Sequence, residues 1–336
     1  MTCYHPIPCA RGVEIATGKI GIYFQPGPPK GVRYIEGLTV PCGKCIGCRL
    51  DHSRQWATRC VHEAKMHKEN SFLTLTYNQE HLPENGSLVV RDMQLFWKRL
   101  RKEIAPIKLR YFQCGEYGSL LNRPHYHAIL FGFDFRDKYL FSSNHGHPIY
   151  RSPLLEKMWS DEFGHPIGYC SIGEVTFESC AYVARYCMKK INGDKAEQHY
   201  QGRKPEYVVM SRRPGIGADW VKTYLTDVYP ADKCLVRQGT NGEILPLRPP
   251  KYYDAIYDTI DPDGMEAIKA RRKDAAKSQH NSSYVDLWQK IALILLEFTQ
   301  ICSVAAKTTQ GKKCYDIFLA PLLQTLKKSA RKALCT

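Results

Sequence analysis

The segment Pro124-His-Tyr-His-Ala-Ile-Leu-Phe-Gly-Phe133 predicts a β-strand that begins at His125, with a chemically active face. Proline opens it, at a position where a missing N–H does little harm to a sheet. Successive side chains of a strand point to opposite faces, so His125 and His127 point the same way. Ile129 and Phe131 continue that face. The two histidines are therefore expected where an apolar core reaches solvent.

Two imidazoles on one face are the start of a divalent metal site, although a bare His-x-His pattern more often marks two ordinary half-buried histidines. The surroundings favour the metal. Leu109–Cys114 is a second predicted strand, and Glu116 follows it just before a turn that contains Gly118. If the two strands pair, Glu116 returns near the histidines. Two imidazoles and one carboxylate would leave open positions on the metal for a phosphate oxygen.

Other strands and helices surround this pair of strands. β-branched and aromatic residues predict strands at Phe72–Tyr77 and Tyr169–Val175, and a short one at Ile20–Phe24. Helices are predicted at residues 51–68, at 92–104 with Asp92 as the cap, and at 176–191 with Thr176 as the cap. No glycine-rich phosphate loop occurs. We expect an α+β fold, in which helices flank an antiparallel sheet.

Two tyrosines, Tyr182 and Tyr186, lie four residues apart on the last of these helices, so they project from the same side. Lys189 lies one turn further on that side. One interpretation is two aromatic rings packed in a core. The other is nucleophilic, because a phenolate can attack a phosphodiester and hold DNA as a phosphotyrosine ester. A free phenol has a pKa near ~10, so it would need help from a nearby cation.

The charge balance favours a polyanionic partner. Lys and Arg number 48 against 33 Asp and Glu, a net charge of +15, which suits nucleic acid or an anionic membrane surface. No run of about 20 apolar residues predicts a membrane span, and the first residues do not have the layout of a secretory signal. We therefore expect no membrane partner and a cytosolic location. Candidate phosphate contacts are Arg99, Lys102, Lys190, Arg212 and Arg213.

The 14 cysteines include a C-x2-C-x2-C cluster, formed by Cys42, Cys45 and Cys48. Three thiolates in seven residues are typical of a structural zinc site, which needs a fourth ligand. The same spacing can begin an iron–sulfur site, and three unliganded cysteines are the third alternative. Candidates for the fourth zinc ligand are Cys3, His5, Cys9, Cys60 and His62.

The order of these motifs resembles the rolling-circle replication initiators of the His-hydrophobic-His (HUH) endonuclease superfamily. The Phe72–Tyr77 strand, the His-hydrophobic-His strand and the Tyr-x-x-x-Tyr-x-x-Lys helix follow one another as in that family. Two tyrosines separated by three residues resemble the microvirus subgroup. Pro41–Arg49 and Arg212–Gly217 resemble its gokushovirus branch, and the resemblance covers roughly residues 1–225.

This resemblance implies a five-stranded antiparallel sheet with helices packed on it. It implies that His125 and His127 bind Mg²⁺ or Mn²⁺, with Glu116 as the third ligand. It also implies that Tyr182 and Tyr186 are alternating nucleophiles. Lys189 would assist them.

The implied reaction is a nick in one strand of supercoiled circular DNA at a viral origin. It would give a 5′-phosphotyrosine and a free 3′-hydroxyl for the host polymerase, with a host helicase as a further partner. The second tyrosine would cut the regenerated junction, and rejoining would release a single-stranded circle. The resemblance therefore places the protein in the cytoplasm of a bacterial host.

Three regions are expected. Residues 1–65 form a Cys-rich N-terminal segment, 66–225 the HUH endonuclease core, and 226–336 a basic, partly helical region of unknown role, which lacks a clear period just past Tyr229. Two alternatives stay open. One is a transposase or plasmid relaxase with the same HUH site. The other is a zinc-containing, basic nucleic-acid-binding protein without enzymatic activity, in which the histidines and tyrosines are core residues.

Overall fold

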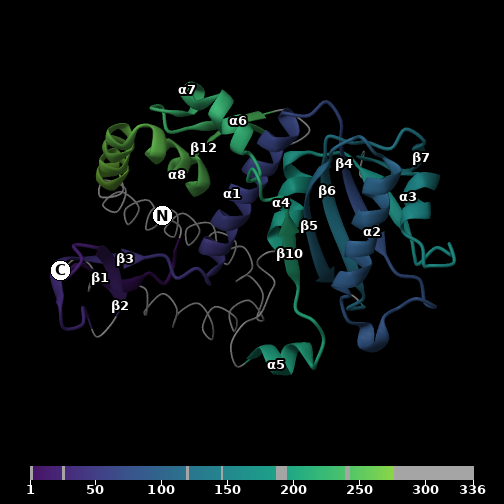
Figure 1. The fold of residues 1–336 in the computed structure, drawn as a ribbon, viewed down its shortest axis with the longest axis horizontal. Coiled ribbons are helices and arrows are strands. Elements are labelled where there is room, and N and C mark those ends of the chain that lie inside the picture. The colour runs from purple at the N-terminus through teal and green to yellow at the C-terminus, as the bar shows by residue number, and fades with distance from the viewer. Residues whose placement is uncertain are drawn as a thin grey trace, which may run out of the picture. The chain divides into compact units, whose positions relative to one another are not determined.

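The computed structural model describes residues 3–24, 27–118, 121–144, 147–186, 195–238 and 243–275, which Figure 1 shows as coloured ribbon. The chain divides into two compact units, Met1–Met265 and Glu266–Thr336. The elements named below all belong to the first unit, and residues 266–275 of the second are helical. No helix within these described ranges is long and apolar enough to span a membrane.

A seven-stranded antiparallel sheet carries the predicted motifs. In spatial order its strands are β10 (Tyr207–Met210), β5 (Arg110–Tyr117), β6 (Pro124–Phe131), β4 (Asn70–Thr76), β9 (Cys170–Gly173), β8 (His147–Arg151) and β7 (Tyr139–Asn144).

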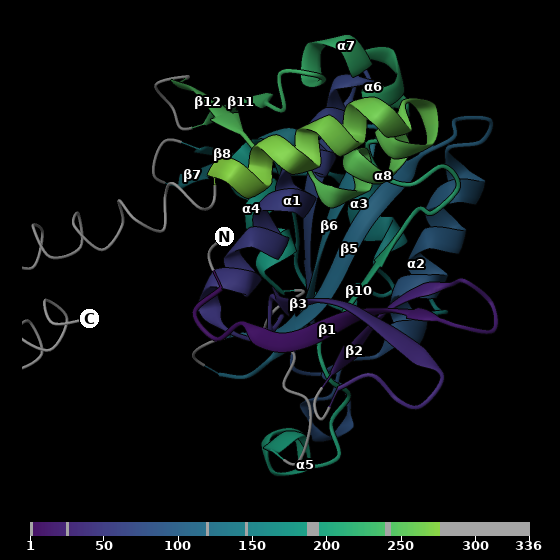
Figure 2. The ribbon, with the colours of Figure 1, turned by 90° about the vertical axis from the view of Figure 1, so that its left-hand side faces the viewer.

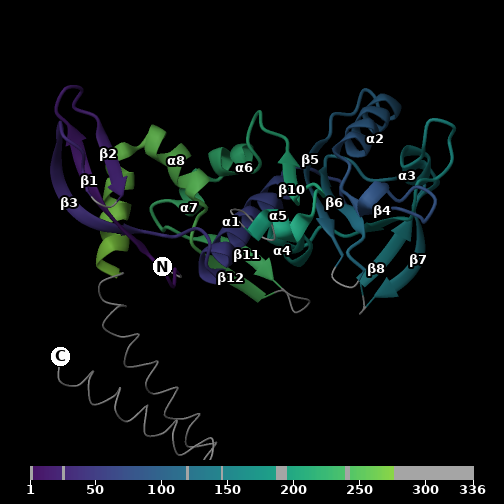
Figure 3. The ribbon, with the colours of Figure 1, turned by 90° about the horizontal axis from the view of Figure 1, so that it is seen from below.

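The expectation of five strands is wrong, because the hairpin β7–β8 extends the sheet beyond β9. Tyr150 of β8 pairs with Ile172 of β9, and Figure 3 shows the hairpin at the end of the sheet away from β10. The hairpin contains Ser142 and Ser143 where a strand signal needs β-branched or aromatic residues. The sequence pattern therefore does not reveal it.

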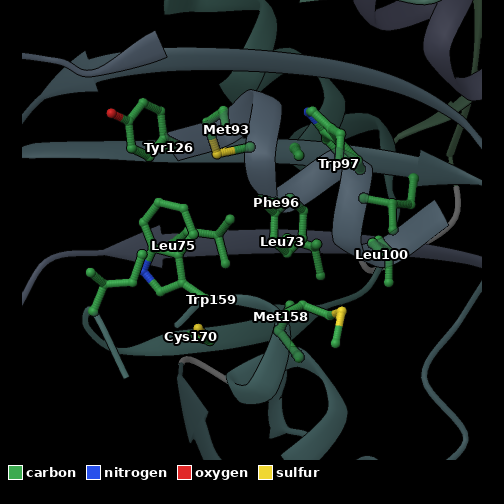
Figure 4. Close-up of a cluster of buried hydrophobic side chains, with 14 of the residues drawn as sticks. Leu73, Leu75, Met93, Phe96, Trp97, Leu100, Tyr126, Met158, Trp159 and Cys170 are labelled. Atoms are coloured by element: carbon green, nitrogen blue, oxygen red, sulfur yellow. The ribbon is translucent and has the colours of Figure 1, made fainter. Parts of the chain in front are cut away.

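One face of the sheet packs under α2 (Val90–Glu103) and α3 (Pro153–Met158). Leu73 of β4 and Tyr126 of β6 are fully buried there against Phe96 of α2, as Figure 4 shows. The Tyr126 hydroxyl is fixed as well, since it donates to a backbone carbonyl at 2.9 Å. Because Tyr126 points to this face, its neighbours on either side in β6 point to the other.

The opposite face packs against α1 (Ile46–Lys65) and α4 (Phe177–Tyr186). Phe112 of β5 and the predicted pair Ile129 and Phe131 of β6 are fully buried in this second cluster. Figure 1 shows the sheet between α1 and α4 on one side and α2 and α3 on the other. His125 and His127 share the face of α1 and α4.

The start of α2 differs from the prediction. Asp92 is not the cap, because the helix begins at Val90 and its N-cap residue is Val89. Asp92 lies in the first turn instead, where its carboxylate accepts a hydrogen bond from the Tyr77 hydroxyl at 2.6 Å. A negative charge in the first turn still suits the helix dipole.

A separate three-stranded antiparallel sheet precedes α1. Its strands are β1 (Ile7–Glu14), β2 (Ile20–Phe24) and β3 (Val32–Val40), in the spatial order β2-β1-β3. Figure 2 shows β1 between its two neighbours. The predicted strand Ile20–Phe24 is confirmed as β2. The cysteine cluster follows β3 and leads into α1.

The chain beyond Tyr229 is more regular than its sequence indicates. A paired hairpin, β11 (Cys234–Gln238) and β12 (Glu243–Leu247), is followed by α8 (Lys251–Ile260). The Tyr253 hydroxyl of α8 lies 3.1 Å from His62 Nδ1 of α1, so α8 belongs to the first unit. The remaining elements are the short 3-10 turn Glu84–Gly86, α5 (Lys195–Tyr200), α6 (Ala218–Thr223) and α7 (Leu225–Val228). The predicted region boundaries at residues 65 and 225 stay predictions.

Candidate active site

Strands β5 and β6 bring three ligating side chains together. Glu116 on β5 is paired in register with His125 on β6. Glu116 Oε1 lies 2.8 Å from His125 Nε2 and 3.1 Å from His127 Nε2. The strand pairing expected from the sequence therefore occurs, and it returns Glu116 to the two histidines. Their role as metal ligands stays a prediction.

The other ring nitrogen of each histidine has a fixed partner. His125 Nδ1 lies 3.1 Å from the carbonyl of Arg123, which only accepts, so this Nδ1 carries a proton. His127 Nδ1 lies 3.0 Å from the hydroxyl of Thr74, the residue opposite it on β4. In a neutral imidazole with Nδ1 protonated, the lone pair is on Nε2. The partners thus prepare both Nε2 atoms to act as ligands.

Glu116 is a buried carboxylate with only 1% of its surface exposed. Burial raises its pKa, but the hydrogen bonds and charges of His125 and His127 outweigh burial and lower the pKa to about 2. The group is therefore ionised at neutral pH. The preceding residue must be small, because a Cβ at Gly115 would lie 2.7 Å from the ring of Tyr207 on the neighbouring strand.

A divalent cation fits this donor set. Two Nε2 atoms and one carboxylate oxygen lie within 4.8 Å of one another, and the ion would replace the present contacts between them. Imidazole suits the transition metals, whereas Mg²⁺ prefers oxygen ligands and octahedral geometry. Two nitrogen ligands therefore favour Mn²⁺ over Mg²⁺. Three protein ligands leave further positions for substrate oxygens.

Helix α4 brings Tyr182 to this site. Thr176 is its cap, as predicted, since the Thr176 hydroxyl accepts from the Ser179 amide at 3.2 Å. The ring of Tyr182 contacts the ring of His127 edge-on, with centroids 5.0 Å apart. It also contacts Phe72 of β4, at 6.4 Å. Tyr182 is half-buried, so it lies at the border between the core and solvent rather than inside the core.

The second tyrosine is less fully described. Tyr186 is the last residue of α4, and four helical residues place its backbone on the same side as Tyr182. Its side chain lies outside the described part of the chain. So do Lys189, Lys190 and the predicted continuation of the helix to Ile191.

The predicted basic residues do not all lie on one face. Arg99 and Lys102 are on α2, across the sheet from the histidines. Arg99 is half-buried and donates to the carbonyl of Ser160 at 2.6 Å, which is a structural contact. Arg212 and Arg213 are exposed, in a turn after β10 that packs through Ile216 into the cluster under α1 and α4.

The predicted cysteine cluster gains one member. Cys3 joins Cys42, Cys45 and Cys48 in a group of four thiols. Of the other candidates for the fourth position, Cys60 and His62 are buried further along α1.

Two side chains at the histidine site were missed by the sequence reasoning. Thr74 binds His127, and Phe72 stacks on it with ring centroids 5.6 Å apart. Both lie on the predicted strand Phe72–Tyr77, at alternate positions. That period could have placed them on one face, but only the pairing of β4 with β6 shows which face.

The comparisons with known proteins agree with this arrangement. Residues 70–191 match a family model that describes replication-associated proteins of the ORF2 type. The matched range includes the strands of both histidines and Glu116, and the helix of both tyrosines. No solved structure is significantly similar to the chain.

Three curated relatives are similar over long stretches. "Replication-associated protein VP4" of Bdellovibrio phage phiMH2K is 31% identical over 299 residues, 85% of this chain and 88% of the relative. "Replication-associated protein ORF2" of Spiroplasma virus 4 is 34% identical over 255 residues, 73% and 76% of the two chains. "Replication-associated protein ORF4" of Chlamydia phage 1 is 32% identical over 195 residues, 55% and 47%.

Proposed function

Because this chain belongs to the family of replication-associated proteins of Microviridae phages, we propose that it starts the replication of a circular phage genome by cutting one DNA strand with a tyrosine. Its partners would be origin DNA, as supercoiled duplex and as single strand. The observation that carries the proposal is the contact of Tyr182 with His127, inside a site that also contains His125 and Glu116.

In the first step, Tyr182 or Tyr186 is the nucleophile. The phenol loses its proton, its oxygen bonds to the phosphorus, and the bond from phosphorus to the 3′ oxygen breaks. The 3′ oxygen takes up a proton and leaves as a hydroxyl, which a host polymerase can extend, aided by a host helicase. The 5′ phosphate stays on the protein as a tyrosine ester.

The three ligands hold and orient the scissile phosphate. His125, His127 and Glu116 would bind Mn²⁺ or Mg²⁺, which supplies Lewis-acid polarisation of a phosphate oxygen when bound. Phe72 and Thr74 keep the His127 ring in one orientation. The edge contact between Tyr182 and His127 then sets the nucleophile beside the bound phosphate.

Two tyrosines on one side of α4 allow a cycle of two transfers. One stays esterified while the other attacks the junction that replication regenerates. The released 3′-hydroxyl can then attack the first ester and close a single-stranded circle. The ester conserves the energy of the broken bond, so rejoining needs no ATP.

The direct test is a covalent adduct between the full chain and the circular genome that encodes it. We expect nicked supercoiled DNA, and a protein band shifted by bound DNA on a denaturing gel, in Mn²⁺ or Mg²⁺ but not in excess chelator. Mn²⁺ is expected to act at lower concentration than Mg²⁺, because two of the three ligands are imidazoles.

Other outcomes identify the alternatives. DNA binding without cleavage in any divalent metal would replace this proposal with a non-enzymatic binding protein. Adducts at the ends of a mobile element, with none on the circular genome, would indicate a transposase or relaxase.

The turn 211–217 predicts where DNA binds. Glu63 Oε2 accepts from the Gly217 amide, and Arg110 Nη2 donates to the Pro214 carbonyl, both at 2.7 Å. These contacts hold the turn firmly on the α1 and α4 face and leave Arg212 and Arg213 exposed. We expect the two arginines to contact phosphates of the bound strand.

Changing Arg212 and Arg213 together to alanine should weaken single-strand binding and lower the slope of log affinity against log salt by about 0.7 for each lost phosphate contact. Fluorescence anisotropy over a salt series measures both. Lys102→Ala is the control, because this exposed lysine lies on α2 across the sheet. An equal loss in both variants would mean that binding is not confined to this face.

A further inference from the structure

Four thiols gather where the N-terminal segment meets the start of α1. Cys3, Cys42, Cys45 and Cys48 each offer a sulfur, and the four sulfurs lie within 4.8 Å of one another. Cys45 Sγ and Cys3 Sγ are 3.9 Å apart, and all four cysteines are free thiols. A tetrahedral zinc with bonds of about 2.3 Å holds its sulfurs about 3.8 Å apart. The cluster therefore has the size of a one-ion site.

The backbone is shaped around these sulfurs. Gly43 has a φ of 72°, a left-handed conformation that other residues rarely adopt, and it turns the chain between the first two cysteines of the motif. Amide groups point at the sulfurs: the Cys45 amide donates to Cys42 Sγ at 3.3 Å, and the Cys42 amide donates to Cys3 Sγ at 3.3 Å. The Cys48 amide donates to Cys45 Sγ at 3.5 Å. Such donors stabilise thiolates, which are the metal-binding form.

Burial separates this cluster from the other described cysteines. The four members are all half-exposed, whereas Cys60, Cys114, Cys170 and Cys180 are buried in the hydrophobic clusters. Buried cysteines act as small apolar side chains. The four half-exposed ones bury little and are not explained by packing.

We propose that Cys3, Cys42, Cys45 and Cys48 bind one zinc ion, and that this ion fixes the start of α1 against the N-terminal segment. Four thiolates select a soft metal over Mg²⁺ or Mn²⁺. An iron–sulfur cluster sits between its ligands and spreads them further than a single ion does, so the close spacing favours zinc. The site is distinct from the one formed by Glu116 and the two histidines.

The zinc site has a route to the nucleophile. Cys45 is the N-cap of α1, and its side chain accepts from the Cys48 amide in the first turn. Two turns later the Ser53 hydroxyl donates to the Ala181 carbonyl of α4 at 3.3 Å. Ala181 precedes Tyr182. An ion that holds the first turn of α1 therefore steadies the helix that carries Tyr182, a step that rests on the proposed function.

Metal content tests the site without any DNA. We expect the full chain to purify with one zinc per protein, measured by mass spectrometry of the digested protein. Replacement by Co²⁺ should give the sulfur-to-cobalt charge-transfer band and the visible spectrum of tetrahedral thiolate coordination. Cys45→Ser should lower zinc affinity at least tenfold in a chelator competition. Cys234→Ala, which removes a buried thiol of β11, should keep one zinc.

Clear results would overturn the proposal. These are wild type without zinc that also fails to take up Co²⁺, full zinc affinity in both Cys3→Ser and Cys45→Ser, or an iron absorption spectrum. The wild-type Co²⁺ spectrum stands even if a variant fails to fold.

The link to Tyr182 has its own readout. In Cys3→Ser, amides in the first turns of α1 and in α4 should exchange hydrogen faster, while β5 and β6 stay protected. Adduct formation should slow in the same variant. Unchanged exchange in α4 would refute the link and leave the zinc site standing. A chain that binds zinc but never forms an adduct would refute the proposed nicking alone.

Discussion

Changing both Tyr182 and Tyr186 to phenylalanine is expected to abolish the covalent protein–DNA adduct, a loss of at least ~10³-fold in its rate of formation. The change removes two oxygen atoms and keeps both rings. The Tyr182 ring should therefore keep its contacts with His127 and Phe72. Loss of the adduct with normal thermal stability would assign the effect to chemistry.

The single variants separate one transfer from two. Tyr182→Phe should still form an adduct through Tyr186, and the converse should hold, because both residues lie on the same side of α4. Neither single variant should complete the cycle that releases a closed single-stranded circle. Denaturing gels of a labelled circular template measure adduct and circle in the same reaction.

Tyr169→Phe is the control for this experiment. Tyr169 is 70% exposed and lies just before β9, so its hydroxyl has no expected role in cleavage. An undiminished adduct in the Tyr182→Phe/Tyr186→Phe double variant would exclude these tyrosines as the nucleophiles. The bound peptide would then have to be identified by digestion.

The active face could be predicted because a strand has a period of two. His125, His127, Ile129 and Phe131 alternate along one segment, so their common face follows from the sequence alone. Glu116 required one further step, the pairing of two strands joined by a short turn. Neighbouring strands in sequence often pair, and here they do.

The missed features depend on contacts between distant parts of the chain. Thr74 reaches His127 only because β4 is the second neighbour of β6, across 53 positions of sequence. Cys3 could be named only as one of several candidates, since 39 positions separate it from Cys42. The cap at Asp92 failed for a related reason, because Tyr77 from β4 takes that carboxylate.

Glu116→Gln is expected to lower the rate of cleavage by about 10²–10³-fold, comparable to losing one group that stabilises charge in the reaction. The amide keeps the shape of the side chain and removes its charge. Glu116 Oε1 is the atom that both Nε2 atoms face, at 2.8 and 3.1 Å. The Mn²⁺ concentration for half-maximal activity should therefore rise at least ~10-fold, because the charged ligand is gone.

A second buried carboxylate provides the matched control. Glu63 is 2% exposed and lies on α1, where it pairs with Arg110 of β5 and accepts from the Gly217 amide. Glu63→Gln should cost stability, about 3–5 kcal/mol, because it leaves the largely buried Arg110 without its charge partner. It should leave the Mn²⁺ requirement unchanged at a temperature where the variant is folded.

Glu116→Gln should show the opposite pattern. Without metal its melting temperature should stay near that of wild type, since it removes a buried charge and leaves a group that can still hydrogen-bond to the histidines. The rise in melting temperature that Mn²⁺ gives to wild type should be lost. If Mn²⁺ stabilised both variants as much as wild type, the ion would bind elsewhere, and the three residues would have to act on DNA directly. A crossed result, with stability lost in one variant and metal response in the other, would establish Glu116 as a ligand independently of any cleavage assay.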